Sequence, residues 1–250
     1  MDFGLLVLLA LAVLGTSFIS GVFGMAGGMI LMGLLLAALS VPAAMVLHGV
    51  TQMTSNGWRA ILWRSKTDYR IFVRYLGGLL VAAVLFAFVR FVPDRALVLI
   101  CLGIVPFLVV LTPEKFVPQA DTRFGAEICG FLNAVLQFIA GVSGPMLDAF
   151  FVRSQMDRRA VVATKAACQT VSHLAKLIYF LNITGTSAGL EVEGIMMGTA
   201  VFMAIAGTSL SKLLLEKMSD MQFRRWTRLL IMTIGTVYLT QGVYAYLVRL

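Results

Sequence analysis

The sequence predicts an all-α integral membrane protein built from two inverted-topology repeats. Three observations lead to this prediction. Of the 250 residues, 60% are hydrophobic and 13% are charged, whereas a soluble domain carries roughly 25% charged residues. Long apolar runs recur along the chain, each close to the roughly 20 residues with which a helix crosses a bilayer. Two of these runs are broken by glycine. Because the runs are continuously apolar, they indicate helices and not the alternating strands of a barrel.

The first half begins with an apolar run at 4–40 that is too long for one simple span. Glycines interrupt it at 21–28, so we interpret it as two short helices that meet at a glycine break. Three uninterrupted spans are expected to follow, at 42–63, 71–92 and 96–111. A linker rich in proline and charge then begins at Thr112. It predicts a boundary between one repeat at 1–112 and another at 113–250.

The second half shows the same order of elements. A run at 124–151 is broken at 141–145. Three expected spans follow, near 159–181, 191–211 and 227–248. The glycine breaks align with each other, and so do the polar residues of the next span, where Gln52 corresponds to Gln169, Ser55 to Ser172 and Arg59 to Lys176. This correspondence is the evidence for an internal repeat.

The distribution of lysine and arginine predicts the orientation of the chain. Basic residues cluster in the short links near 64–70, 153–159 and 212–225, and cytoplasmic loops carry such an excess. These links and the one at 113–123 are therefore expected in the cytoplasm, with both termini outside. The two halves then have inverted topologies, which requires an odd number of crossings in each. Either a re-entrant hairpin plus three spans or five short spans would satisfy this requirement.

The glycine breaks are the first candidate site. A helix broken inside a membrane leaves backbone N–H groups without partners, so its ends must line a cavity or meet a ligand. Helix N-termini also carry a partial positive charge that favours anions. The candidate residues are Gly24, Gly27 and Gly28 in the first break and Gly141, Ser143 and Gly144 in the second. Tight helix packing is the alternative explanation of such glycines, and it is the one expected for Gly194 and Gly198.

Polar side chains inside the spans form the second candidate site, because ionisable groups in a membrane interior normally face a cavity or a partner. Helical spacing aligns many of them on one face of their span. They are His48, Gln52, Ser55 and Asn56 in the first half, and Lys165, Gln169, Ser172, His173 and Lys176 in the second. Asp148 could carry a coupling proton or form a salt bridge with Lys165. In the alternative, a purely structural role, Arg59 and Lys165 mark span ends and both histidines are packing residues.

Other functions have little support in the sequence. The net charge of +8 comes from basic residues concentrated in links, which report orientation and not a nucleic-acid partner. The three cysteines stand singly in apolar segments, so neither a metal site nor a disulfide framework is expected. No nucleotide-binding, zinc-protease or serine-hydrolase motif occurs. We therefore expect no enzyme activity and no cofactor. Inverted repeats with glycine-interrupted segments at matching positions instead predict a secondary transporter whose substrate binds near the midplane, and a membrane assembly factor or membrane-embedded enzyme is the alternative.

The glycine-rich stretch at 20–28 and the corresponding stretch at 140–144 resemble the TauE/SafE family of sulfite exporters and toluene-sulfonate uptake permeases. The segments at 41–44 and 159–165 resemble a later part of the family motif, and the likeness covers nearly the whole chain. It departs from the family where Pro145 follows Gly144 and where Lys165 follows Thr164. The resemblance implies transport of sulfite, thiosulfate, sulfonates or related organic anions across a bacterial inner membrane, and we expect this transport to proceed by alternating access. Substrate identity, direction and oligomeric state stay open.

Overall fold

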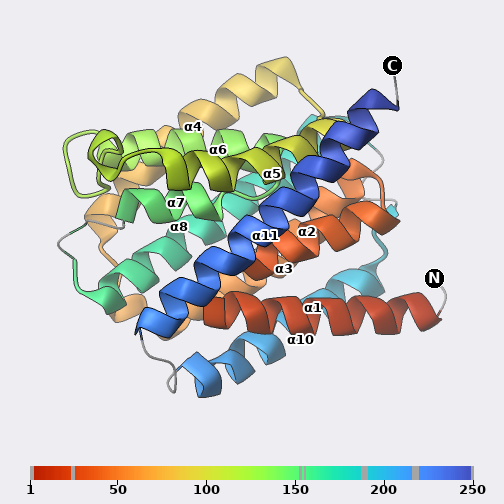
Figure 1. Cartoon of the computed structure of the whole chain (residues 1–250), viewed down its shortest axis with the longest axis horizontal. Coiled ribbons are helices and arrows are strands. Elements are labelled where there is room, and N and C mark those ends of the chain that lie inside the picture. Colours follow the sequence, from red (N-terminus) through yellow and green to blue (C-terminus); the bar gives the residue numbers. More distant parts are fainter. Residues whose placement is uncertain are drawn as a thin grey trace.

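A computed structural model describes residues 3–23, 26–151, 154, 156–186, 191–215 and 220–248 (Figure 1). This part of the chain is helical and contains no strand, as the predicted fold class requires. The helices, in chain order, are α1 (Phe3–Phe23), α2 (Ala26–Ala38), α3 (Val41–Leu62), α4 (Tyr69–Val89), α5 (Arg95–Leu111), α6 (Gly125–Ile139), α7 (Gly144–Phe151), α8 (Arg158–Ile178), α10 (Gly194–Leu215) and α11 (Asp220–Leu247). A π-helical turn, η3 (Tyr179–Ile183), extends α8.

Side-chain caps determine where several of these helices begin. The Asp68 carboxylate accepts hydrogen bonds from the backbone N–H groups of the first turn of α4, and Asp94 caps α5 in the same way. Ser40 caps α3, where Pro42 occupies the first turn and needs no N–H partner. The caps place the starts of α3, α4 and α5 within two residues of the expected spans. The prediction of these three helices is confirmed.

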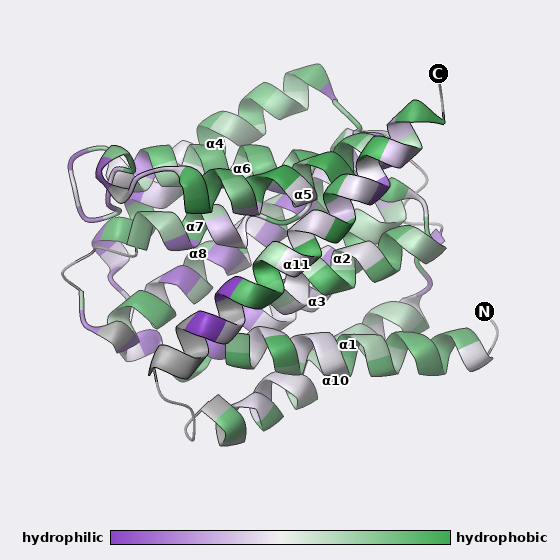
Figure 2. Cartoon of the chain, in the orientation of Figure 1, coloured by the Kyte–Doolittle hydropathy of each residue, from purple (hydrophilic) through white to green (hydrophobic). Residues whose placement is uncertain are grey.

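The outer helices are suited to lipid. Within the described residues, four helices are long and apolar enough to cross a membrane: α1, α4, α10 and α11. Large apolar side chains such as Phe88, which is 84% exposed, cover their outer surfaces. In contrast, α3 and α8 are long but more polar, and Figure 2 shows pale and purple residues along them. The two polar helices pack against each other inside the bundle, where their polar faces are shielded from lipid.

Each half contains a helical hairpin at its glycine break. In Figure 1, α1 begins at the right-hand end of the molecule and α2 returns toward that end. The second hairpin opens at the left: α6 begins there and α7 returns, so that the Ala120 N–H donates to the Phe150 carbonyl at 2.8 Å. The two hairpins therefore enter from opposite ends. The 8 residues of α7 are too few to cross a bilayer, which supports a re-entrant hairpin in the second half, whereas α1 is long enough to cross.

Helix packing follows a twofold pattern. Helix α1 packs along α10 just as α6 packs along α4, while α3 packs with α8 and α5 with α11. Exchanging the first five helices for the second five leaves this set of pairs unchanged. Glycines permit the closest approaches: a Cβ on Gly78 would lie 1.8 Å from the Glu127 carbonyl oxygen, and one on Gly207 would lie 2.4 Å from that of Leu14. The pattern supports the proposed division into repeats 1–112 and 113–250.

The expected packing of Gly194 and Gly198 against another helix is wrong. A Cβ at either position would meet no other described atom within 4 Å. Both glycines lie on the exposed face of α10, because Met196 and Ala200 turn the opposite face of that helix inward. Spacing alone could not indicate which face of α10 is buried.

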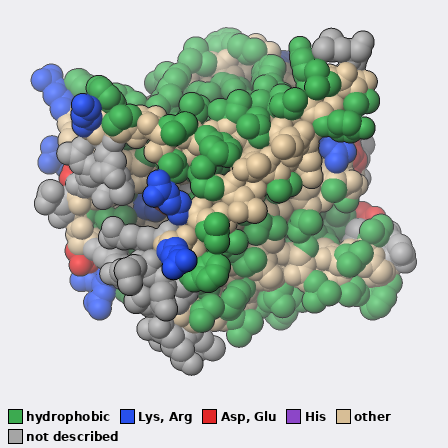
Figure 3. Space-filling view, viewed as in Figure 1, with side chains coloured by type: hydrophobic (Ala, Val, Ile, Leu, Met, Phe, Trp, Pro, Cys, Tyr) green, Lys and Arg blue, Asp and Glu red, His purple; other side chains and the backbone are tan. Residues whose placement is uncertain are grey.

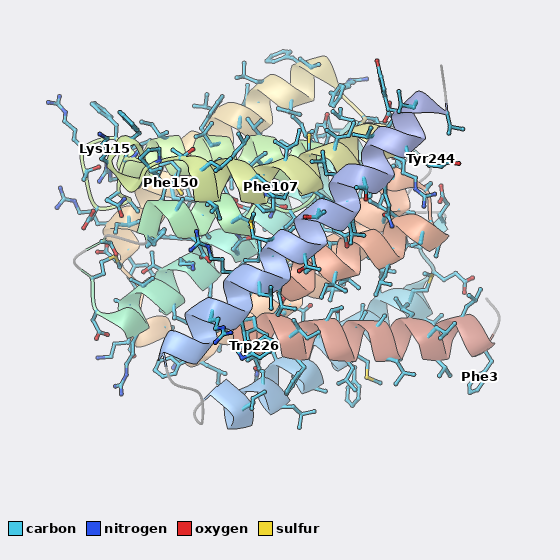
Figure 4. The ribbon with its side chains drawn as sticks, in the orientation of Figure 1. Phe3, Phe107, Lys115, Phe150, Trp226 and Tyr244 are labelled. Atoms are coloured by element: carbon cyan, nitrogen blue, oxygen red, sulfur yellow. The ribbon has the colours of Figure 1, made fainter. Side chains whose placement is uncertain are left out.

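The two ends of the bundle differ in charge. The links after α3, α5 and α7, together with the start of α11, lie at the left in Figure 1, and both chain ends lie at the right. Lys and Arg side chains gather at the left-hand end in Figure 3. Figure 4 shows Lys115 at this end and Phe3 at the opposite one. The links predicted to be cytoplasmic thus share one end, opposite both termini.

Candidate functional site

A chain of hydrogen bonds joins the two glycine breaks across the contact between α3 and α8. His48 Nε2 lies 3.0 Å from the carbonyl oxygen of Gly28, in the first turns of α2. His48 Nδ1 lies 2.9 Å from Lys176 Nζ, which also donates to the Gly141 carbonyl at 2.9 Å. His48 is 1% exposed and Lys176 is 0% exposed. Two side chains predicted from different halves of the sequence therefore meet between the two breaks.

The donors and acceptors in this chain set the direction of its hydrogen bonds. The Gly28 carbonyl can only accept, so His48 donates to it from Nε2. In the neutral imidazole Nδ1 then accepts from Lys176 Nζ, which can donate as an ammonium or as an amine. Among the described residues no carboxylate forms an ion pair with Lys176. When Lys176 is protonated, its charge is buried without a counter-ion, an arrangement that favours an anionic ligand.

Side-chain amides surround this charge and leave hydrogen-bonding atoms unused. Gln137 of α6 places Nε2 3.4 Å from Gln169 Oε1 and 3.3 Å from His173 Nε2. The His48 and His173 rings lie 5.5 Å apart between centroids. Gln52 Nε2 and Gln169 Nε2 are buried and have no partner among the described residues. Buried donors without partners are rare and indicate a ligand or an ordered water.

Gln52 and Gln169 occupy matching positions in the two halves, so their free N–H groups form a pseudo-symmetric pair of donors. The Gln52 carboxamide lies against the backbone of Gly28, where a Cβ would stand 3.3 Å from Gln52 Cδ. Glycine thus leaves room for this side chain beside the start of α2.

Other predicted residues have structural contacts. The Ser55 hydroxyl lies 2.7 Å from that of Thr208 in α10, and the Ser172 hydroxyl lies 2.6 Å from that of Tyr75 in α4. These bonds tie α3 and α8 to their neighbours in equivalent ways. Asn56 Nδ2 donates to the Gln52 carbonyl one turn earlier in α3, at 2.9 Å.

Residues of the two breaks also differ in their surroundings. A Cβ on Gly27 would lie 2.0 Å from the Thr16 carbonyl oxygen, so this glycine serves the packing of α1 against α2. The Ser143 hydroxyl donates to Asn133 Oδ1 at 2.8 Å and closes the hairpin of α6 and α7. Gly144 begins α7. Gly24 lies outside the described residues.

Lys165 and Asp148 form an ion pair, the alternative to a coupling role that the sequence suggested. Their side chains are 27% and 37% exposed, so this pair lies nearer the surface than Lys176 does. Arg59, in the last turn of α3, donates to the Ser20 carbonyl at 3.5 Å. Lys165 and Lys176 therefore belong to two different clusters, and they do not share one site.

Sequence reasoning missed Gln137 and Asn133. They stand four residues apart in α6 and share its buried face, so an amphipathic pattern within the second broken run was an available signal. Among the described residues no group of three or more His, Cys, Asp or Glu side chains is placed to hold a metal ion. The chemistry at the centre is that of hydrogen-bond donors and one positive charge.

The fold and this centre define a multi-pass helical membrane protein with a polar interior at two broken helices, a design found in transporters. A family comparison agrees: the model of the family described as sulfite exporter TauE/SafE matches residues 8–238. The chain belongs to the TauE/SafE family, a family of membrane transporters. Searches of curated proteins and of solved structures return no match to this chain.

Proposed function

We propose that this protein is a secondary transporter that moves a small sulfur-containing or organic anion, of the sulfite, thiosulfate or sulfonate class, across a bacterial inner membrane by alternating access. One observation carries the proposal. The buried Lys176 ammonium bridges the two hairpin breaks and forms no ion pair with a described carboxylate. An anion supplies the missing counter-charge.

The groups around Lys176 suit an oxyanion. Gln52 Nε2 and Gln169 Nε2 offer N–H donors from two directions. The starts of α2 and α7 lie at the breaks, and helix N-termini favour negative charge. An anion held by the ammonium, the amides and these helix ends would receive charge-assisted hydrogen bonds, which are stronger than neutral ones. Sulfite, thiosulfate and sulfonates present several oxygens that can accept such bonds together.

The fold supports alternating access between repeats 1–112 and 113–250. One hairpin enters from each end of the molecule (Figure 1). At the centre, His48, Gln169 and Lys176 are buried. A closed centre between inverted halves corresponds to an occluded state, from which either half could open. In this mechanism the two hairpins separate in turn, so that the central anion faces one side of the membrane and then the other.

Asp148 is the candidate for a coupling group. It is partly exposed and pairs with Lys165, so water can supply a proton to the carboxylate. Protonation would release Lys165 as a free cation. Coupling of anion movement to a proton would follow if release of Lys165 changes the stability of one hairpin.

Uptake into proteoliposomes tests the proposed function. The purified protein is reconstituted and given sulfite, thiosulfate, methanesulfonate or acetate, with empty liposomes as the control. We expect faster uptake of at least one sulfur oxyanion than of acetate, and a weakened response in Gln169→Ala, which removes one of the unpaired donors. If the folded wild-type protein neither binds nor moves any of these anions, the proposed function is wrong and a non-transporting role gains support.

A further inference from the structure

The repeat register places a second cationic cluster opposite the first. It aligns Arg59 with Lys176 and His48 with Lys165. Because Lys176 near the end of α8 contacts His48 near the start of α3, the two helices run antiparallel. Arg59 and Lys165 therefore lie at the other end of the same helix pair. They are the pseudo-symmetric counterparts of the two residues that join the breaks.

The contacts at the two ends correspond. Lys176 donates to the Gly141 carbonyl in the second broken run, and Arg59 donates to the Ser20 carbonyl in the first. Ser20 immediately precedes Gly21, the residue that aligns with Gly141. Each end of the helix pair thus holds a cation against the backbone of a broken element.

The partners of the other two residues also align. His48 bonds the Gly28 carbonyl, and Lys165 pairs with Asp148, which stands at the position equivalent to Gly28. The Asp148 carboxylate neutralises the charge of Lys165. At the other end, the imidazole of His48 is itself neutral. Each end is therefore left with one positive charge, on Lys176 at the first and on Arg59 at the second.

The second cluster has an unused buried group of its own. Ser20 is 3% exposed, and its hydroxyl has no hydrogen-bond partner among the described residues. Arg59 contacts the backbone carbonyl of the same serine, so an anion at the guanidinium could also accept a bond from the Ser20 hydroxyl.

We propose that Arg59 and the Ser20 hydroxyl form a second anion-binding site, at which the transported oxyanion waits between the Lys176 site and the end of the molecule where α3 meets α4. This inference rests on the proposed function. Eleven positions separate His48 from Arg59, a rise of about 16 Å along a helix. The side chains of Lys165 and its partner Asp148 are partly exposed, whereas Lys176 is fully buried, so the second site lies at the less enclosed end of the helix pair.

Transport measured from each face of the membrane tests this site. Right-side-out and inverted membrane vesicles are prepared from cells expressing each variant, and sulfite uptake is followed. We expect Arg59→Gln to raise the half-saturating sulfite concentration more than tenfold in inverted vesicles, where the α3–α4 link is expected to face outward. The same change should have less than a threefold effect in right-side-out vesicles. Arg59→Lys keeps the charge and should recover most of the loss.

Two further variants keep the test independent of folding. Arg64→Gln removes a guanidinium from the exposed turn beyond α3 and should leave uptake unchanged. Asp148→Asn removes the counter-charge of Lys165 and so leaves a second free cation at this end of the helix pair, which should lower the half-saturating concentration severalfold in inverted vesicles. If Arg59→Gln does not fold, no change or an increase with Asp148→Asn overturns the second site.

The outcomes separate this inference from the function on which it rests. Normal half-saturation in Arg59→Gln from both faces, or an equal increase from both, refutes the second site even where Lys176→Met impairs transport. If wild-type vesicles move none of sulfite, thiosulfate, methanesulfonate and acetate, the proposed function itself fails.

Discussion

Replacement of Lys176 by methionine removes the ammonium that joins the two hairpin breaks and keeps a side chain of similar length. Lys176 is fully buried and its Nζ lies 2.9 Å from both His48 Nδ1 and the Gly141 carbonyl oxygen. The variant therefore deletes a desolvated charge and both of its hydrogen bonds. His48 stays neutral and keeps its contact with Gly28. The main change at the site is electrostatic.

The structure allows the size of this effect to be bounded. An anion about 4 Å from an ammonium gains about 4 kcal/mol at an effective dielectric constant of about 20. Part of this gain offsets the removal of the anion from water. We therefore expect Lys176→Met to weaken anion binding by more than tenfold, or more than about 1.4 kcal/mol. Lys66→Met, on an exposed turn, should have almost no effect.

Equilibrium binding of sulfite and thiosulfate to purified protein in detergent measures this difference, with thermal unfolding as the check that each variant is folded. Wild-type affinity in Lys176→Met together with lost binding in Lys165→Met would assign the charge to the other lysine. Normal binding in both variants would mean that backbone and neutral groups alone form the site. In that case the argument from the unpaired ammonium is wrong.

Further predictions concern packing, the break and topology. Gly78→Ala forces a Cβ against a backbone carbonyl of α6 and should lower the free energy of unfolding by roughly 1–3 kcal/mol. Gly77→Ala, which has open space around it, should leave that free energy unchanged. Thermal denaturation in detergent measures the difference. Gly141→Ala should destabilise the protein by at least about 1 kcal/mol, because its φ of +71° favours glycine and two methionines crowd the position; a wild-type melting temperature would contradict this. Reporter fusions after Lys66 and at Leu250 should report opposite sides of the membrane, and the same side for both would refute the inverted arrangement.

Much of the fold could be predicted from the sequence because it depends on local patterns. Continuous apolar runs determine helices that can face lipid, and capping residues such as Ser40, Asp68 and Asp94 determine where helices begin. Glycines interrupt two runs, and the hairpins occur there. Helical spacing also predicted that Gln52 and Lys176 stand on polar faces of their helices. Each of these features depends on residues a few positions apart.

Which of these faces meet was decided only by the tertiary structure. Spacing could not show that Lys176 contacts His48 while Lys165 pairs with Asp148, because the first contact depends on the packing of α3 against α8 and the second on that of α7 against α8. It also could not tell Gly27, which packs against α1, from Gly198, which faces outward. Composition and periodicity are properties of single helices. A site formed by several helices depends on how closely their backbones approach, and that distance is set by contacts between residues far apart in the chain.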